Sequence, residues 1–246
     1  MRIKCSFICD EIPISYRMLF VSILKKCLEQ ANEEYFNQLY YYQKQHRNKR
    51  SKNFTFSVFL RDYQLDKEVF RLDQGEVEWF ISSPDREFIL YLYNGLQKNN
   101  SFNFQKYELH RKRIDLLPEK IINHSAIVCQ TMSPIYIKNK DQQVLSPDQI
   151  EYHHELNYIA NITLKNARGT GLKKELQFKP LDMKKIVSKE AIATFQKETN
   201  RPYLYVEAYK GQFQLQGDPE DLNMLYQTGL SFRRNAGYGM FEILST

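Results

Sequence analysis

The segment HRNKRSK, residues 46–52, places a histidine beside several arginines and lysines, a combination suited to acid–base chemistry on an anionic substrate. His46 titrates near neutral pH and can act as a general acid or base, a role worth about 10²–10⁴-fold in rate. Lys52 can stabilise negative charge that develops on a phosphate. The pair suits RNA cleavage by a 2′-hydroxyl on the adjacent phosphate, a reaction that needs no metal. An exposed histidine in a basic loop is the alternative, and the spacing alone favours that alternative.

A second candidate segment is GLSFRRNAGYGMFEIL, residues 229–244, which holds three of the nine glycines. It lacks the Gly-Lys-Ser/Thr of a Walker A loop, and it follows a helix and precedes a strand, which is the reverse of a dinucleotide fingerprint. Glycines let backbone amides approach an anion, and Arg233 and Arg234 could add charge-assisted contacts to phosphates. The alternative is a helix cap at Gly229 followed by a tight turn at Gly237 and Gly239. The spacing leaves these two interpretations about even.

Charge and composition favour an anionic partner. The 246-residue chain has a net charge of +6 and an isoelectric point near 8.9, and 14% of its residues are aromatic. Its basic residues gather in five clusters, at residues 46–52, 110–113, 172–174, 183–185 and 232–234. Basic clusters interleaved with Tyr and Phe suit RNA, whose splayed bases stack on aromatic rings. One such cluster indicates only a solvated surface, whereas five favour nucleic acid modestly.

Several classes of protein find no support in the sequence. Cys5 and Cys9 stand in a C-x3-C spacing with no second pair, so we expect buried free thiols in a reducing cytosol and no zinc framework. No G-x-S-x-G elbow indicates a serine hydrolase. No signal peptide and no apolar run approaching ~20 residues is found. The expectation is a cytoplasmic protein with no metal, no cofactor and no membrane association.

The first half of the chain predicts a β-α-β-β-α-β unit with an extra strand or two. Apolar residues recur every three or four positions in one helix from about Ser15 to Tyr42. The remaining predicted elements are a strand at 1–9, a strand at 54–62, a hairpin over 67–83 that turns at residues 73–75, a helix that Ser83 caps and Gly95 ends, and a strand at 101–110.

The second half repeats this order. We expect strands over 126–139 broken at Pro134, a helix over 146–167 opened by a Ser146–Gln149 capping box, a short strand at 175–181, a hairpin over 201–217 turning at Lys210-Gly211, a helix capped by Asp218 and ended by Gly229, and a strand at 239–244. The prediction is therefore an α+β fold of two tandem ferredoxin-like (RRM-like) domains, residues 1–117 and 118–246, with a C-terminal glycine-rich loop. Tandem copies of such a unit leave a cleft between two sheets, and clefts of this kind commonly hold ligands.

Three segments together resemble a known family: the glycine segment, HRNKRSKNFTFSVF, and TMSPIYIK at 131–138. They resemble the CRISPR-associated endoribonuclease that processes precursor CRISPR RNA, a member of the RAMP superfamily, and the resemblance covers essentially the whole chain. It implies tandem ferredoxin-like domains and metal-independent cleavage of CRISPR repeat RNA into mature guide RNAs. The products would carry a 2′,3′-cyclic phosphate and a 5′-hydroxyl.

The resemblance also implies roles for individual residues. His46 would be the general acid/base and Lys52 the phosphate stabiliser. Many members carry a catalytic tyrosine in the first helix, where this chain has Lys25 or Lys26 at the matching position, and Ser231 stands where family loops often have glycine. The implied RNA-binding residues are Gly229, Arg233, Arg234, Gly237 and Gly239 in the loop, with Arg47, Lys49 and Arg50 in the basic cluster.

Implied partners are CRISPR repeat RNA, other CRISPR-associated proteins of an interference complex, and a second copy of the chain. Two alternative functions share these features. The first is a non-catalytic RAMP-type RNA-binding subunit of a CRISPR ribonucleoprotein complex. The second is a general single-strand RNA-binding module.

Overall fold

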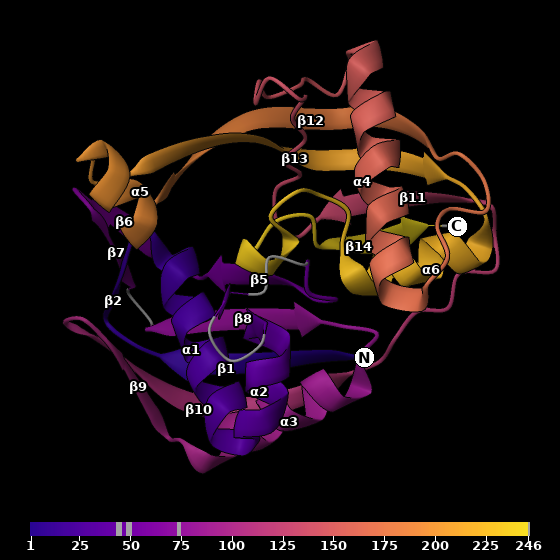
Figure 1. Cartoon of the computed structure of the whole chain (residues 1–246). Helices are drawn as coiled ribbons and strands as arrows, with labels where there is room; N and C mark the ends of the chain where they lie inside the picture. Colours follow the sequence, from indigo (N-terminus) through magenta and orange to yellow (C-terminus); the bar gives the residue numbers. More distant parts are fainter. Residues whose placement is uncertain (43–45, 48–50, 73–74, 246) are drawn as a thin grey trace.

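The computed structural model describes residues 1–42, 46–47, 51–72 and 75–245. For Tyr42, His46 and Arg47 it describes the backbone alone. The chain forms two α+β halves, each built on its own antiparallel sheet, and Figure 1 shows the N-terminal half below the C-terminal half. The predicted tandem ferredoxin-like fold with a C-terminal glycine-rich loop is confirmed.

The N-terminal half is organised around a five-stranded sheet of order β5-β8-β1-β10-β9. Its elements are β1 (Arg2–Ile8), β2 (Glu11–Pro13), α1 (Tyr16–Ala31), α2 (Glu33–Tyr40), β3 (Tyr41–Tyr42), β4 (His46–Arg47), β5 (Thr55–Leu60), β6 (Tyr63–Asp66), β7 (Val69–Leu72), β8 (Glu76–Ser82), α3 (Arg86–Lys98), β9 (Ser101–Phe104) and β10 (Tyr107–Leu117). Strands β1, β5, β8 and β10 with helices α1 and α3 make up the predicted β-α-β-β-α-β unit. The additional strands form two small sheets, β2-β7-β6 and β3-β4, and the edge strand β9.

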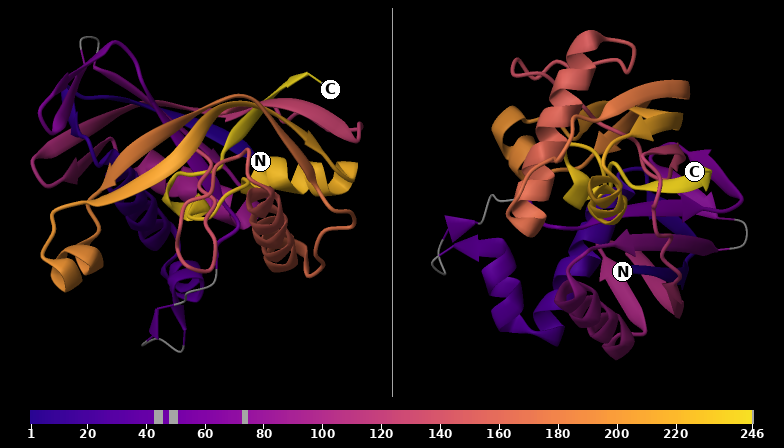
Figure 2. Two further views of the ribbon diagram at one scale, coloured as in Figure 1. Left: turned by 90° about the horizontal axis from the view of Figure 1, so that it is seen from above. Right: turned by 90° about the vertical axis from the view of Figure 1, so that its right-hand side faces the viewer.

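The C-terminal half repeats the arrangement with a four-stranded sheet of order β12-β13-β11-β14. Its elements are β11 (Ala126–Thr131), α4 (Ile150–Arg168), β12 (Gln177–Glu190), α5 (Ala193–Thr199), β13 (Leu204–Gln216), α6 (Pro219–Thr228), the 3₁₀ turn η1 (Arg234–Ala236) and β14 (Phe241–Ser245). The long strands β12 and β13 carry α5 to the end of the molecule away from α4 and α6 (Figure 2).

Each half has its own apolar core. The N-terminal core packs one face of β1, with Ile3, Cys5 and Phe7, against α1, α3 and Trp79 of β8. The C-terminal core packs Phe213 and Phe241 of the second sheet against α4 and α6. The four cysteines are free and buried, as the sequence predicts. No helix in the described part of the chain is long and apolar enough to cross a membrane.

Two buried arginines join the halves. Arg2 of β1 reaches Glu242 of β14 at 2.7 Å and donates hydrogen bonds to the carbonyl oxygens of Tyr226 and Phe241. Arg17 of α1 pairs with Glu190, which also accepts a 2.8 Å hydrogen bond from the Tyr238 hydroxyl. A buried charge is stable only with such partners, so these contacts fix how the two domains sit relative to each other.

The predicted single helix from Ser15 to Tyr42 is wrong. Asn32 interrupts it with an extended backbone (φ −158°), and its side chain accepts a hydrogen bond from the amide of Tyr35. That contact is an N-cap, which starts α2 as a separate helix. Periodicity alone could not show the break, because the apolar spacing continues across Asn32.

Both predicted hairpins are also wrong in their pairing. Strand β7 pairs with β2 and β6, whereas β8 pairs with β1 and β5, so residues 67–83 form no hairpin. Strand β13 runs through Lys210-Gly211 without turning, and β12 pairs along its whole length. A Cβ on Gly211 would lie 1.8 Å from the Asp182 carbonyl oxygen, so this glycine serves close backbone approach at a bulge in β12.

Smaller differences concern helix ends and strand lengths. Helix α3 is capped by Asp85 and passes through Gly95, which leaves room for the Cys27 carbonyl of α1. The strand predicted at 101–110 is divided into β9 and β10, and the one predicted at 175–181 is the long β12. Helix α6 begins after Asp218 and ends at Gly229, as predicted.

Candidate active site

The glycine-rich loop, defined here as residues 229–240, lies between β13 of its own domain and β5 of the N-terminal domain (Figure 1). A Cβ added to Gly229 would lie 2.8 Å from the Thr55 side chain, and one added to Gly237 would lie 2.6 Å from the Phe56 ring. The Thr55 hydroxyl also donates a 2.9 Å hydrogen bond to the Tyr238 carbonyl. Close approach of β5 therefore accounts for these glycines without a bound ligand.

Gly237→Ala is expected to lower the free energy of unfolding by about 2–5 kcal/mol. Gly237 has φ +84°, and the added methyl would overlap the Phe56 ring, so backbone strain and overpacking each contribute. Gly169→Ala is the matched control, since Gly169 has φ +85° with nothing within 4 Å of the added Cβ. Urea denaturation should give a clearly smaller loss for the control, and equal losses would contradict the close-approach explanation.

The two loop arginines lie in different environments. Arg234 is buried, and its guanidinium donates to the Thr228 carbonyl at 2.7 Å and to the Ser51 hydroxyl at 2.8 Å. Burial lowers the pKa of Arg234 to about 10. Arg233 is exposed. The sequence predicts phosphate contacts for both, but only Arg233 has its side chain at the surface, and the burial of Arg234 argues for a structural role.

Asn235 of the loop holds the backbone on both sides of Lys52. Its side-chain oxygen accepts a hydrogen bond from the Lys52 amide at 2.9 Å. Its side-chain nitrogen donates to the carbonyl oxygens of Lys52 at 2.8 Å and Phe54 at 2.7 Å. The glycine-rich loop thus positions the segment that carries Lys52, although about 180 residues separate them. The sequence analysis did not single out Asn235, and spacing contains no signal for this contact.

Lys52 and Lys25 converge on the ring of Tyr40. The Lys25 ammonium lies 5.0 Å and the Lys52 ammonium 5.3 Å from the ring centroid. Burial lowers the pKa of Lys52, and the positive charge of Lys25 lowers it further. Burial raises the pKa of the Tyr40 hydroxyl, so the ring stays neutral. Two ammonium groups on one aromatic ring concentrate positive charge at this point, which suits an anionic ligand.

Tyr40 is a site residue that the sequence analysis missed. The apolar stripe that predicts one helix to Tyr42 does not include it. The only available signal was its place in the run Tyr40-Tyr41-Tyr42 beside the basic cluster. Because α2 is a separate helix, its last residue turns toward α1 and Lys25.

The other predicted site residues fall in three places. Lys26 is exposed on α1, about 100° around the helix from Lys25. His46 and Arg47 form β4, in which the His46 backbone pairs with Tyr42 in a two-stranded sheet just after α2. His46 therefore lies in a strand that follows α2. Lys49 and Arg50 lie outside the described residues.

Metal-ligand geometry does not occur in the described ranges, where no group of three or more His, Cys, Asp or Glu side chains could hold an ion.

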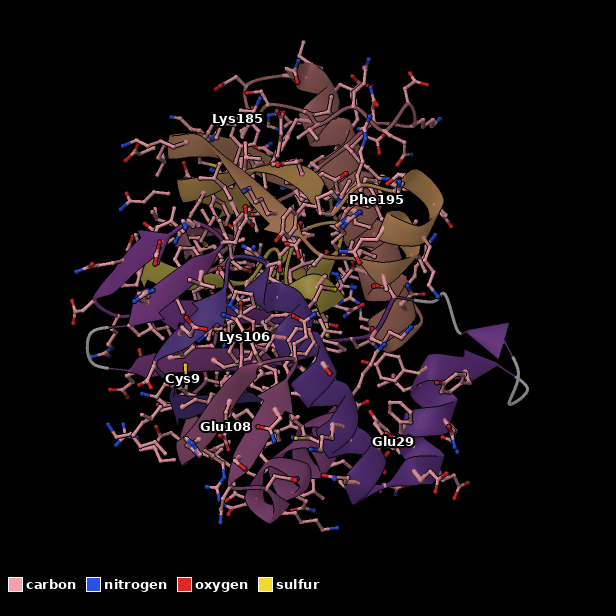
Figure 3. All side chains as sticks on the ribbon, turned by 90° about the vertical axis from the view of Figure 1, so that its left-hand side faces the viewer. Cys9, Glu29, Lys106, Glu108, Lys185 and Phe195 are labelled. Atoms are coloured by element: carbon pink, nitrogen blue, oxygen red, sulfur yellow. The ribbon has the colours of Figure 1, made fainter. Side chains whose placement is uncertain are left out.

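The basic clusters are partly neutralised. Lys173 pairs with Glu220, Arg113 with Asp115 at 3.0 Å, and Lys185 with Glu207 at 2.7 Å. Figure 3 shows Lys185 on the C-terminal half, far from the Lys106 and Glu108 of the N-terminal half.

The fold, with its C-terminal glycine-rich loop, is shared by solved tandem ferredoxin-like proteins. A protein described as the product of a Cas6-related gene from Pyrococcus furiosus has a TM-score of 0.83 and 17% identity, over 99% of this chain and 98% of that one. A RAMP protein binding different RNA substrates has a TM-score of 0.81 and 17% identity, over 100% of both chains.

Sequence comparison gives the family. Residues 117–243 match the model of CRISPR associated protein Cas6, C-terminal. The CRISPR-associated endoribonuclease Cas6 1 of Methanocaldococcus jannaschii is 30% identical over 142 residues, which are 56% of this chain and 52% of that protein. The alignment therefore spans about half the length of this curated relative. The chain belongs to the Cas6 family.

Proposed function

We propose that the protein is an endoribonuclease that cleaves CRISPR repeat RNA in precursor transcripts without a metal ion, giving mature guide RNAs. The single observation that carries the proposal is the convergence of Lys25 and Lys52 on Tyr40, beside the hairpin of His46, in a chain of the Cas6 family. The relative from Methanocaldococcus jannaschii is an endoribonuclease by name, which supports the assignment.

In the proposed reaction, His46 removes the proton of the 2′-hydroxyl next to the cut. The 2′-oxygen attacks the adjacent phosphorus, and the bond from phosphorus to the 5′-oxygen breaks. The leaving 5′-oxygen takes up a proton from water, His46 returns its proton to solvent, and the other product keeps a 2′,3′-cyclic phosphate. Lys52, with Lys25, stabilises the additional negative charge on the phosphate during this step.

A single-turnover assay tests the function. End-labelled repeat RNA should be cut at one position at the same rate with and without EDTA, and a 2′-deoxy substitution at that position should block the cut. The 3′ end of the product should resist phosphatase until acid opens the cyclic phosphate. Binding without cleavage would instead support a non-catalytic RNA-binding subunit, and loss of activity in EDTA would refute metal independence.

Lys25→Ala is expected to slow cleavage by about tenfold or more, whereas Lys26→Ala should leave the rate within about twofold. Only Lys25 places its ammonium over Tyr40 beside Lys52, and removing one charge that stabilises a transition state typically costs that much or more. Comparing the two variants under single-turnover conditions checks this assignment. A larger effect of Lys26→Ala would reverse it.

We further propose that the domains divide between residues 117 and 118. The strands of the first sheet end at Leu117 and those of the second begin at Ala126, which supports this boundary. The proposed setting is the cytoplasm. The proposed partners are CRISPR repeat RNA, other CRISPR-associated proteins and a second copy of the chain.

A further inference from the structure

Two adjoining cavities lie on the C-terminal domain, away from Lys52. One, of about 540 Å³, is lined by Lys138, Tyr158 and Phe232. The other, of about 460 Å³, is lined by Tyr136, Tyr205 and Arg233. They share Lys138 and Gln142, so they adjoin at these two side chains, and together they are called the groove below. Both volumes fall in the range of small-ligand sites, about 300–1,000 Å³.

The groove alternates cations with aromatic rings. The Lys138 ammonium lies 5.9 Å from the Phe232 ring centroid, and the Arg233 guanidinium lies 5.7 Å from that of Tyr136. Burial lowers the pKa of Lys138, and the charge of Arg233 lowers it further, which shows that the two cations lie within each other's field. Such a pair favours an anion between them.

Two of the rings are open to solvent. Tyr158 of α4 is 56% exposed and Tyr205 of β13 is 60% exposed. An exposed aromatic ring beside a cation offers a flat surface on which a nucleobase can stack while its phosphate meets the charge.

The glycine-rich loop fixes the base of the groove. The Ser231 hydroxyl accepts a 2.8 Å hydrogen bond from the Tyr136 amide and donates one of 3.1 Å to its carbonyl. The Phe232 amide donates to the same carbonyl at 3.0 Å. Ser231 therefore ties this loop to Tyr136. The same loop holds Lys52 through Asn235, so it connects the groove to the candidate active site.

We propose that this base-binding groove, formed by Tyr136, Lys138, Tyr158, Tyr205, Phe232 and Arg233, binds unpaired nucleotides of the RNA substrate. Bases stack on Tyr158 and Tyr205, and a phosphate lies between Lys138 and Arg233. The bases of a duplex are stacked inside it and cannot reach these rings, so the groove selects single-stranded RNA. The inference rests on the proposed function, because it takes repeat RNA as the ligand.

Tyr158→Ala tests the groove with minimal effect on folding, since the ring is exposed. Its affinity for repeat RNA made uncleavable by a 2′-deoxy substitution at the cut should fall about 5- to 150-fold in fluorescence anisotropy, as loss of one stacked base predicts. Tyr63→Ala on β6, in the other domain, is the matched control, since Tyr63 is 52% exposed, and it should bind as wild type. A fully paired repeat duplex should bind both variants equally.

An abasic scan of the same RNA separates stacking from an indirect structural effect. At the nucleotide that stacks on Tyr158, an abasic site should remove most of the difference between wild type and Tyr158→Ala, because coupled changes are not additive. Wild-type affinity of Tyr158→Ala, or a difference that persists at every abasic position, would overturn the proposal and leave the groove to a protein partner. Cleavage by the wild type is measured separately, so failure of the groove and failure of the nuclease assignment give different results.

Discussion

His46→Ala is expected to slow single-turnover cleavage of repeat RNA by about 10²–10⁴-fold, the usual contribution of a general acid or base. The substitution removes an imidazole, the type of side chain whose ordinary pKa lies closest to neutral pH. RNA affinity should change little, because the lysines that attract the phosphate remain. The measurement is the rate of the chemical step at saturating protein, alongside the dissociation constant for uncleavable RNA.

His154→Ala is the matched control, since His154 is exposed on α4 in the other domain. His46→Gly offers a second check, because free imidazole in the buffer should restore part of the rate if the lost group is a proton-transfer catalyst. Cleavage by His46→Ala at the wild-type rate would show that another residue moves the proton.

Lys52→Ala is expected to lower the cleavage rate by about 10²–10³-fold, the typical cost of removing one donor that stabilises a transition-state charge. The contacts of Asn235 use the backbone of Lys52, so they survive the substitution. Thermal unfolding should therefore stay close to wild type while the single-turnover rate falls. Lys197→Ala, at an exposed position of α5, should change neither quantity.

The pH dependence of the rate gives a sharper test of Lys52. Burial first and Lys25 second lower the pKa of its ammonium, which is the active form. As pH rises through this lowered pKa, Lys52 loses its proton. The cleavage rate should therefore fall at a pH below the pKa of an ordinary lysine. Lys52→Arg should move that fall to higher pH, since a guanidinium keeps its proton. If the fall in rate at high pH were unchanged in Lys52→Arg, a group other than Lys52 would be responsible for that fall.

The sequence predicts the fold class well because local signals agree with it. Proline and glycine around Asp218 and Gly229 mark both ends of α6, and the two halves repeat one order of helices and strands. Such local signals predict less well which strands pair with each other. A turn signal at residues 73–75 fits a hairpin, yet β7 and β8 join different sheets because their partners lie elsewhere in the chain. The sequence around Gly211 predicts a turn, whereas in the structure Gly211 lets the backbones of β12 and β13 approach each other closely.

For the candidate site, too, the sequence predicts some features and only the tertiary structure shows the others. By itself the sequence determined the tandem fold class and the family resemblance, because residue type and short-range order carry that information. Only through that resemblance does it offer His46 and Lys52 as catalytic residues, and their roles are a prediction that the cleavage assays test. The tertiary structure decided that Lys25 and not Lys26 shares the Tyr40 ring with Lys52, and that Asn235 holds the Lys52 backbone. It also decided that Gly229 and Gly237 pack against β5, that Gly239 packs against Leu230 and Ser231 of its own loop, and that Arg234 is buried. The physical reason is that these contacts join segments up to about 180 residues apart, so they depend on how two domains pack and not on any local pattern.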